Sequence, residues 1–280
     1  MKLPDPLVST EWLAEHISAP DIRIIDASWH FPASGRNARD EYGVAHIEGA
    51  LFFDIDDIAD TASPYPHMLP DAVKFASRVR KLGLGDGNRI VVYDQLGLFS
   101  APRAWWMFRA MGHADVVVLD GGLPKWIAEG RPLDDLPPIP RERHFTPRPN
   151  RTIIRDLQQM KANLASKAEQ VIDARSSGRF MATEPEPRPG LKGGHIPGSI
   201  NIPYTELLQP NGTMKPAAVL KELFSTRGID TGRPITATCG SGVTAAIIAL
   251  GLARIGNYEA AIYDGSWSEW GTVQGLPIEA

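Results

Sequence analysis

Short apolar runs and longer amphipathic runs alternate along the chain. Apolar and β-branched residues dominate 23–27, 89–93 and 116–119, which predicts buried strands. The stretches 71–82 and 101–111 place apolar residues at helical spacing. This alternation is typical of an α/β fold in which a parallel sheet is flanked by helices on both faces. We therefore expect functional side chains outside the carboxyl ends of the strands.

The same pattern occurs a second time in the chain. Four segments of the first half have counterparts in the second half, in the same order: 25–27 with 172–174, 45–50 with 194–199, 89–94 with 234–239, and 119–126 with 263–270. The paired positions are separated by 147 residues (26 to 173), 149 (46 to 195), 145 (94 to 239) and 144 (120 to 264). Such nearly constant offsets indicate a duplicated domain.

A proline-rich segment separates the two halves. Prolines at 132, 137, 138, 140, 147 and 149 lie among mixed charges with little apolar periodicity. This composition is typical of a semi-extended linker that runs over the surface. We expect an N-terminal domain over 1–130, a linker over 131–150 and a C-terminal domain over 151–280.

The only cysteine, Cys239, lies between a predicted strand at 234–238 and a predicted helix from 243 to a stop at Gly256. A helix N-terminus presents unpaired N–H groups that favour the thiolate. Gly240 and Gly242 allow the backbone to curl into an anion-binding nest. A buried cysteine with a packing role is the alternative. We favour a nucleophile, and only in the second half, because Asp94 occupies the matching position in the first.

Composition limits the classes of partner. The chain has a net charge of −4, with 43% hydrophobic and 22% charged residues and no basic cluster, so we expect neither nucleic acid nor a membrane surface as partner. No run approaches the roughly 18 apolar residues of a membrane span, and the N-terminus carries no apolar leader. A single cysteine fits a reducing compartment. We expect a soluble, cytoplasmic protein.

The repeated His-Ile-x-Gly loops, the Asp-Gly-x-x-x-x-Trp segments and the loop Cys-Gly-Ser-Gly-Val-Thr at 239–244 resemble the rhodanese superfamily, and most closely its mercaptopyruvate sulfurtransferase branch. The resemblance covers nearly the whole chain. It implies two tandem rhodanese-like domains, of which the second is catalytic and carries sulfur as a persulfide on Cys239. It also implies that the loop binds substrate through Gly240, Gly242, Val243 and Thr244.

The residues after the cysteine bear on the sulfur donor. Thiosulfate-using relatives typically have cations there, whereas this chain has Gly240 and Ser241. A dianion gains more from adjacent cations than a carboxylate does, so the loop disfavours thiosulfate as the best donor. The resemblance implies that Arg179 and Arg188 hold the carboxylate and keto oxygen of 3-mercaptopyruvate. The alternative is that both are ordinary surface arginines.

The resemblance further implies a Ser-His-Asp arrangement across the domain interface. Ser241 supplies the hydroxyl, while His67 and Asp56 are the matching residues of the first half. Such a set polarises a carbonyl or transfers a proton, with Asp56 orienting the imidazole. The alternative is that His67 is an exposed loop residue and Asp56 a helix N-cap.

Several other polar or aromatic residues invite a functional interpretation. Residues repeated in both halves are expected to be structural, because only one half has a thiol; they are His46, His195, Asp26 and Asp173. The pair Trp105-Trp106 is expected to serve packing. Arg103 lies near the start of a predicted helix, and the sequence does not decide whether it faces the cleft.

The expected activity is ping-pong transfer of sulfur from 3-mercaptopyruvate to cyanide, a thiol or a thioredoxin-like protein, with release of pyruvate. No metal or other cofactor is expected, because the histidines and the cysteine lack ligand spacing. A thiosulfate:cyanide sulfurtransferase and a non-enzymatic persulfide carrier are the alternatives. A Cys-x5-Arg phosphatase is disfavoured, because Ala245 stands where the phosphate-binding arginine belongs.

Overall fold

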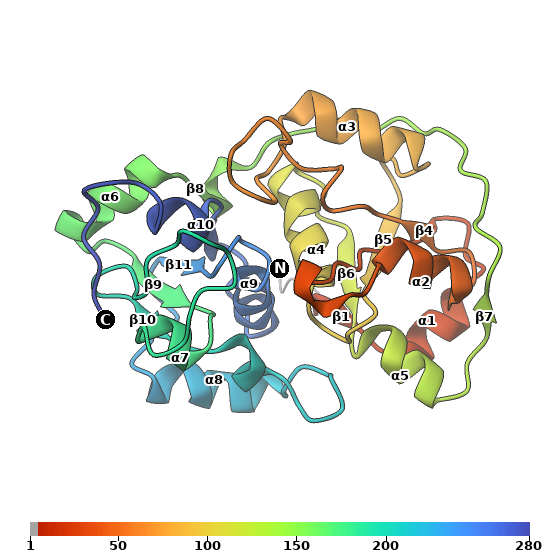
Figure 1. Cartoon of the computed structure of the whole chain (residues 1–280). Helices are drawn as coiled ribbons and strands as arrows, with labels where there is room; N and C mark the ends of the chain where they lie inside the picture. Colours follow the sequence, from red (N-terminus) through yellow and green to blue (C-terminus); the bar gives the residue numbers. More distant parts are fainter. Residues whose placement is uncertain (1–4) are drawn as a thin grey trace.

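The computed structural model describes residues 5–280, and each half of the chain forms a five-stranded, all-parallel sheet (Figure 1). The N-terminal sheet has the order β1 (Leu7–Val8), β6 (Val116–Leu119), β5 (Arg89–Tyr93), β2 (Ile22–Asp26), β4 (Leu51–Phe52). Read in the corresponding direction, the C-terminal sheet has the order β8 (Ile154–Arg155), β12 (Ala261–Tyr263), β11 (Ile235–Thr238), β9 (Gln170–Asp173), β10 (Ile200–Asn201). Equivalent strands occupy equivalent places, which confirms the predicted duplication.

Helices cover both faces of each sheet, as the alternating pattern predicts. The N-terminal domain contains α1 (Thr10–His16), α2 (Ala38–Val44), α3 (Ala72–Lys81), α4 (Ala101–Ala110) and α5 (Gly122–Ala128). The C-terminal domain contains α6 (Leu157–Ser166), α7 (Ser177–Phe180), α8 (Ala217–Thr226), α9 (Ala245–Arg254) and α10 (Ser266–Trp270). Alternate residues of β5 explain this arrangement: Ile90 and Val92 pack with α3 and α4, whereas Val91 packs with α1 and α5.

The two domains meet where α4 packs against α9 (Figure 1). These helices follow the equivalent strands β5 and β11, and one continuous apolar core runs through both domains at this contact. Trp105 and Trp106 are buried in it, and the Trp106 indole donates a hydrogen bond to the carbonyl of Ile153 at 3.1 Å. Both tryptophans therefore serve packing, as expected.

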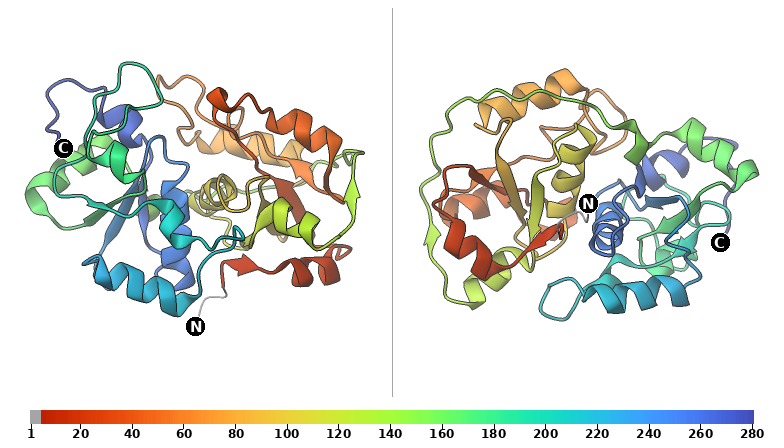
Figure 2. Two further views of the ribbon diagram at one scale, coloured as in Figure 1. Left: turned by 60° about the horizontal axis from the view of Figure 1, so that its bottom comes forward. Right: turned by 180° about the vertical axis from the view of Figure 1, so that it is seen from behind.

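The segment between the domains runs along the outside of the N-terminal domain (Figure 2). It is extended, and besides connecting the domains it packs against the N-terminal domain. Its β7 (Leu133–Asp134) pairs antiparallel with β3 (His46–Ile47). Phe145 is buried against Phe75 and Phe108. One aromatic side chain can fill a gap in a neighbouring core without any apolar periodicity around it, which explains why the sequence pattern gave no sign of this contact.

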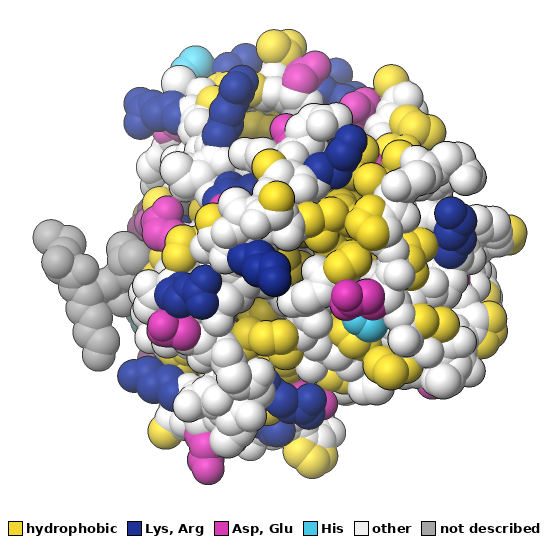
Figure 3. All heavy atoms as spheres, turned by 90° about the vertical axis from the view of Figure 1, so that its left-hand side faces the viewer, with side chains coloured by type: hydrophobic (Ala, Val, Ile, Leu, Met, Phe, Trp, Pro, Cys, Tyr) yellow, Lys and Arg dark blue, Asp and Glu magenta, His cyan; other side chains and the backbone are white. Residues whose placement is uncertain are grey.

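No helix in residues 5–280 is long and apolar enough to cross a membrane. On the face of the C-terminal domain shown in Figure 3, Lys and Arg side chains are spread among acidic and uncharged ones.

Candidate active site

Cys239 follows β11 directly and is 2% exposed. The carbonyls of Cys239 and Gly240 accept hydrogen bonds from the N–H groups of Trp267 and Ser268, at 2.9 and 2.8 Å, and the Cys239 N–H donates to the Ser266 hydroxyl at 3.2 Å. By contrast, the backbone N–H groups of 240–244 have no acceptor within the described part of the chain. Five consecutive donors therefore remain free beside the thiol, in the arrangement expected of an anion nest.

A cavity of about 210 Å³ lies over Cys239 between the two domains. Its C-terminal wall carries cationic and polar groups, and its N-terminal wall is aromatic. The lining residues are Ala174, Arg175, Ser176, Arg179, Arg188, Tyr204, Gly240, Ser241, Val243 and Thr244 from one domain, with Trp29, Phe31 and Phe99 from the other. This volume suits a small ligand that pairs an anionic end with an apolar body.

Arg179 and Arg188 both reach this cavity, but they differ in their partners. Glu186 accepts hydrogen bonds from Nη2 and Nε of Arg179, at 2.6 and 3.2 Å. Arg188 makes one long hydrogen bond, from Nη2 to the Ser241 hydroxyl at 3.4 Å. Burial lowers the pKa of Arg188, the nearby Cys239 opposes this shift, and the charge of Arg179 adds to it. Arg188 is thus the arginine with donors free for an anion in the field of the thiol.

Gly240 allows these arginines to approach the loop. A Cβ at this position would lie 3.0 Å from Nη2 of Arg179 and 3.7 Å from Nη1 of Arg188. Any larger side chain here would therefore press on the guanidinium groups. The absence of a side chain at position 240 therefore leaves room for the cations of Arg179 and Arg188 on the same wall of the cavity.

Ser241, His67 and Asp56 form a chain of contacts across the domain interface. Nδ1 of His67 lies 3.0 Å from the Ser241 hydroxyl, and Nε2 lies 3.1 Å from Oδ1 of Asp56. The second oxygen of Asp56 accepts a hydrogen bond from the Trp29 indole at 3.0 Å. The residues named by the resemblance therefore lie together. Ser241 lines the cavity, whereas His67 and Asp56 do not.

The protonation of this chain follows from its partners. Burial would raise the pKa of Asp56, but the hydrogen bond and charge of His67 and the Trp29 indole lower it overall. An ionised Asp56 only accepts, so the ring proton of His67 resides on Nε2 and Nδ1 accepts from the Ser241 hydroxyl. Burial lowers the pKa of His67 despite Asp56, helped by Arg103 and Arg188. The imidazole is consequently neutral at neutral pH and ready to accept a proton.

Gly242, which the resemblance names as substrate-binding, contacts Arg103, whose placement the sequence did not decide. Gly242 does not line the cavity; its φ of +78° and its carbonyl instead accommodate the Arg103 side chain. Arg103 is fully buried and donates to Asp264 at 2.7 Å. It therefore faces the domain interface rather than the cavity.

Trp29 and Glu186 are among the residues at the site that the sequence did not single out. Trp29 closely follows the end of β2, so the rule that sites lie at the carboxyl ends of strands was a usable signal for it. Glu186 lies between the two arginines in sequence, but no pattern distinguishes it from the neighbouring Glu184. Its 1% exposed side chain is held by Arg175 at 2.8 Å as well as by Arg179.

His46 and His195 have matching structural contacts in the two halves. Nδ1 of His46 lies 2.8 Å from the Tyr42 carbonyl, and Nδ1 of His195 lies 2.9 Å from the Phe180 carbonyl. Each imidazole stacks on the ring of that same residue, with centroids 4.1 and 3.6 Å apart. Neither lines the cavity over Cys239. The pair holds equivalent turns.

In the first half, the loop that corresponds to the Cys239 loop has its backbone N–H groups bound by a side chain of the same loop. Oδ2 of Asp94 accepts from the N–H groups of Phe99, Ser100 and Ala101 at 2.8, 2.9 and 2.8 Å. Oδ1 accepts from the Leu96 N–H at 2.9 Å. A carboxylate is thus the ligand of this loop's backbone donors.

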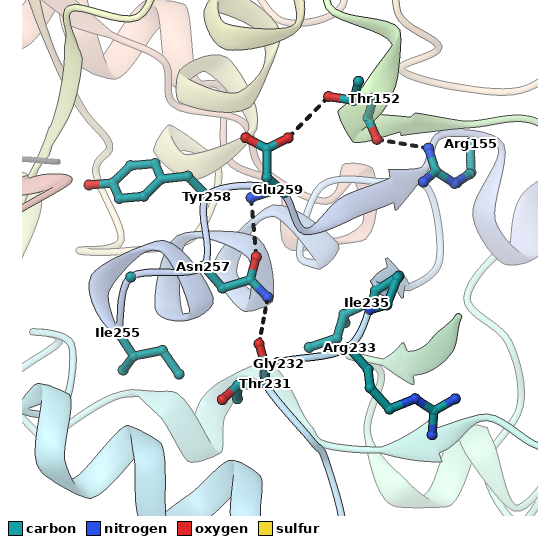
Figure 4. Close-up of a pocket in the computed structure, with 12 residues that line it drawn as sticks. Thr152, Arg155, Thr231, Gly232, Arg233, Ile235, Ile255, Asn257, Tyr258 and Glu259 are labelled. Atoms are coloured by element: carbon teal, nitrogen blue, oxygen red, sulfur yellow. Dashed lines mark hydrogen bonds between the residues drawn. The ribbon is translucent and has the colours of Figure 1, made fainter. Parts of the chain in front are cut away.

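A larger hollow of about 600 Å³ lies at the opposite, amino end of β11 (Figure 4). Its polar groups bond to one another: Thr152 donates to Glu259 at 3.2 Å, and Asn257 donates to the Thr231 carbonyl at 3.2 Å. It is not lined by Cys239, and it lies at the end of the sheet where parallel α/β folds rarely place a site. The smaller cavity is therefore the candidate active site.

Comparison with known proteins identifies the family of the chain. The rhodanese-like domain family model matches residues 9–129 and again 156–272. Human 3-mercaptopyruvate sulfurtransferase is 46% identical over 270 residues, which cover 94% of this chain and 91% of that protein. Rat thiosulfate sulfurtransferase is 45% identical over 271 residues, again 94% of this chain and 91% of that protein.

Among solved structures, that of SseA from Escherichia coli, described as a 3-mercaptopyruvate sulfotransferase with the rhodanese fold, superimposes with a TM-score of 0.87 at 40% identity. The match covers 95% of this chain and all (100%) of that one. With two matched domains over most of its length, the chain belongs to the rhodanese-like domain family.

Proposed function

We propose that the protein is a 3-mercaptopyruvate sulfurtransferase that carries sulfur as a persulfide on Cys239 and releases pyruvate. The observation that supports this most directly is the placement of Arg188, which has one long hydrogen bond, in the cavity that Cys239 lines and beside a loop without cations. A planar guanidinium suits a carboxylate, and the cavity volume of about 210 Å³ suits a three-carbon acid.

Substrate binding divides between the two walls. Arg188 takes the carboxylate, while Arg179, held by Glu186, offers its remaining donors to the keto oxygen. The aromatic wall from Trp29 and Phe99 covers the methylene carbon. These contacts bring the donor's sulfur to the Cys239 thiolate.

The first half-reaction forms one S–S bond and breaks one S–C bond. The Cys239 thiolate attacks the sulfur of 3-mercaptopyruvate, and the electron pair of the S–C bond leaves with pyruvate as its enolate. The proton of the donor's sulfhydryl passes through Ser241 to Nδ1 of His67, where Asp56 stabilises the imidazolium. The same proton returns to the methylene carbon, which yields pyruvate. The free N–H groups of 240–244 hold the terminal sulfur of the persulfide.

In the second half-reaction an acceptor thiolate or cyanide attacks that terminal sulfur and restores the Cys239 thiolate. We include a small thiol and a thioredoxin-like protein among the acceptors, since both carry the nucleophile that this step needs. A reducing location such as the cytoplasm is consistent with a single free thiol.

Thiosulfate is the second candidate donor. The relatives include an enzyme named for it, and the same two arginines can attract a dianion. It needs no carbon protonation, however, so the Ser241–His67–Asp56 chain has no use in its reaction. A persulfide carrier without turnover is the third candidate.

The ratio of kcat/KM for 3-mercaptopyruvate to that for thiosulfate, measured with a small thiol as acceptor, separates the three candidates. We expect pyruvate release to exceed thiosulfate turnover clearly. Robust use of thiosulfate without pyruvate release would contradict the proposal, and absence of turnover with either donor would favour the carrier.

A further inference from the structure

Arg103 joins three segments at the domain interface. It lies on α4 of the N-terminal domain, and its fully buried guanidinium sits over the Trp106 ring, 4.5 Å from the centroid. It donates to the carboxylate of Asp264 at 2.7 Å, to the carbonyl of Gly242 at 3.4 Å, and to the carbonyl of His67. The Gly242 carbonyl belongs to the loop that carries Cys239, and the His67 carbonyl belongs to the histidine proposed to transfer the proton.

Asp264 holds the histidine segment from the other domain. Its second carboxylate oxygen accepts a hydrogen bond from the Leu69 N–H at 2.7 Å. The 67–69 segment of the N-terminal domain is therefore fixed to the C-terminal domain twice, directly at Leu69 and through Arg103 at His67. This restraint matters because His67 has φ +63°, a left-handed conformation that a non-glycine residue keeps only when its surroundings impose it.

The active loop is shaped to admit this contact. A Cβ at position 242 would lie 2.9 Å from Nη1 of Arg103 and 3.0 Å from the Asp264 carbonyl, and φ at this residue is +78°. Glycine at this position therefore meets both a backbone requirement and the space requirement of the buried guanidinium.

We propose that Arg103 and Asp264 are positioning residues that set the contact between His67 and Ser241 across the domain interface. The inference rests on the proposed role of this pair in proton transfer. His67 and Ser241 belong to different domains and meet at 3.0 Å, so their distance depends on how the domains are held. Arg103 binds the backbone at His67 and at Gly242, next to Ser241, and so fixes both ends of the contact. A misplacement of about 1 Å in such a contact can slow catalysis by about 10²-fold.

Arg103→Lys tests this inference in the full-length protein, because lysine keeps the charge but cannot reach three acceptors at once. We expect kcat with 3-mercaptopyruvate to fall about tenfold or more, with KM little changed. Persulfide formation from thiosulfate should keep its rate, since that leaving group needs no proton on carbon.

Arg109→Lys is the matched control. Arg109 lies on the same helix and also crosses the interface, donating to the Tyr258 carbonyl at 3.2 Å, but it contacts neither His67 nor the active loop. It should leave the ratio of the two donor rates unchanged. Asp264→Asn provides a second probe of the same contact and replaces Arg103→Lys if that variant does not fold.

A double-mutant cycle with His67→Gln distinguishes positioning from general stabilisation. If Arg103 acts through His67, Arg103→Lys causes no further loss of kcat in the His67→Gln background. Independent, multiplying losses, or equal losses for both donors, would overturn the inference while leaving the proposed function intact. A full kcat for His67→Gln alone would overturn both the proton-transfer role and the inference. A wild-type protein that releases no pyruvate would instead reject the proposed function itself.

Discussion

The equivalent loops of the two domains follow equivalent strands, but their backbone N–H groups differ in whether they have an acceptor. In the first, the side chain of Asp94 occupies the backbone donors of its own loop, with four hydrogen bonds of 2.8 to 2.9 Å. In the second, Cys239 stands at the same place, and the N–H groups of 240–244 have no acceptor among residues 5–280. The N–H groups of the first loop bind the loop's own carboxylate, whereas those of the second loop are available to an external anion.

This difference shows what the fold supplies and what the residues add. A strand, a tight loop and a helix N-terminus make an anion site in both domains, so the site is a property of the duplicated fold. The residue at the end of the strand then decides whether that site is structural or reactive. In the second domain, Arg188 and Ser241 add the means to hold a donor and to move a proton.

The largest effect should follow from Cys239→Ser, which removes the nucleophile but hardly changes side-chain volume. We expect no persulfide by mass spectrometry, no pyruvate release, and an unfolding temperature close to that of the wild type. A second variant moves the thiol to the other loop: Cys239→Ser combined with Asp94→Cys should remain inactive, because Arg188 and Ser241 lie at the Cys239 loop. Sulfur transfer by either variant would show that the thiol's surroundings have been misread.

Asp94→Ala should destabilise the protein by roughly 3–4 kcal/mol, because three buried N–H groups and the part-buried Leu96 N–H lose their acceptor at about 1 kcal/mol each. Denaturant unfolding measures this loss, and Asp94→Asn should lose less because its amide oxygen still accepts. Added acetate should raise the unfolding temperature of Asp94→Ala more than that of the wild type by refilling the site. Equal responses to acetate would mean that the loop does not bind a carboxylate on its own.

Arg188→Lys should lower kcat/KM for 3-mercaptopyruvate by about 10²-fold, the range expected when a charge-paired partner loses its fork geometry. Thiosulfate use should fall much less. Arg179→Lys is the matched comparison, and we expect a smaller effect, about tenfold, because Glu186 already occupies much of that guanidinium. Steady-state kinetics with both donors measure the two ratios. Equal losses for the two donors would argue against a dedicated carboxylate site.

The smallest effect concerns Asp26 at the end of β2, and its comparison is Asp173, which occupies the equivalent place at the end of β9. Asp173 is paired with the buried Arg175. Asp26 has neutral partners, including the Ser28 N–H at 2.9 Å, and burial raises its pKa from 3.8 to about 6. The folded state therefore binds this proton more tightly than the unfolded state, so stability due to Asp26 is full below about pH 4 and is lost as pH rises to about 6.

Asp26→Asn should accordingly stabilise the protein at pH 7 by about 1–2 kcal/mol, with the gain disappearing near pH 4. Asp173→Asn should destabilise it by about 3 kcal/mol, because Arg175 loses a buried partner. Urea unfolding at the two pH values gives both numbers. The same sign for both substitutions at pH 7 would refute the distinction between the two aspartates.

Much of the local structure was readable from the pattern of residues. The strands β5 and β6 coincide with the predicted runs 89–93 and 116–119, since continuous β-branched residues have few alternatives to a buried strand. The helix after Cys239 begins at Ala245 rather than Val243, because the tight loop needs those two residues. The linker's contribution of Phe145 to a neighbouring core left no periodic signal.

The site was readable only in part. Cys239 followed from its place between strand and helix, whereas Arg179, Arg188, His67 and Asp56 came from the resemblance to a family. No local pattern joins His67 to Ser241, which lie 174 positions apart. Trp29 and Glu186 were missed because their roles depend on hydrogen bonds to residues that are already at the site.

The sequence by itself determined the duplication, the parallel α/β domains and the single reactive loop, because strand and helix periods, glycine positions and a lone thiol are local properties. Tertiary structure decided which loop has backbone N–H groups without an acceptor and which loop has them bound. It decided which arginine is available to an anion. It also decided that Arg103 fastens His67 to the active loop. The Arg103 contacts join groups far apart in the chain, which meet where α4 packs against α9. The Asp94 and Glu186 contacts join residues close in sequence, but they depend on side-chain directions that residue patterns do not specify.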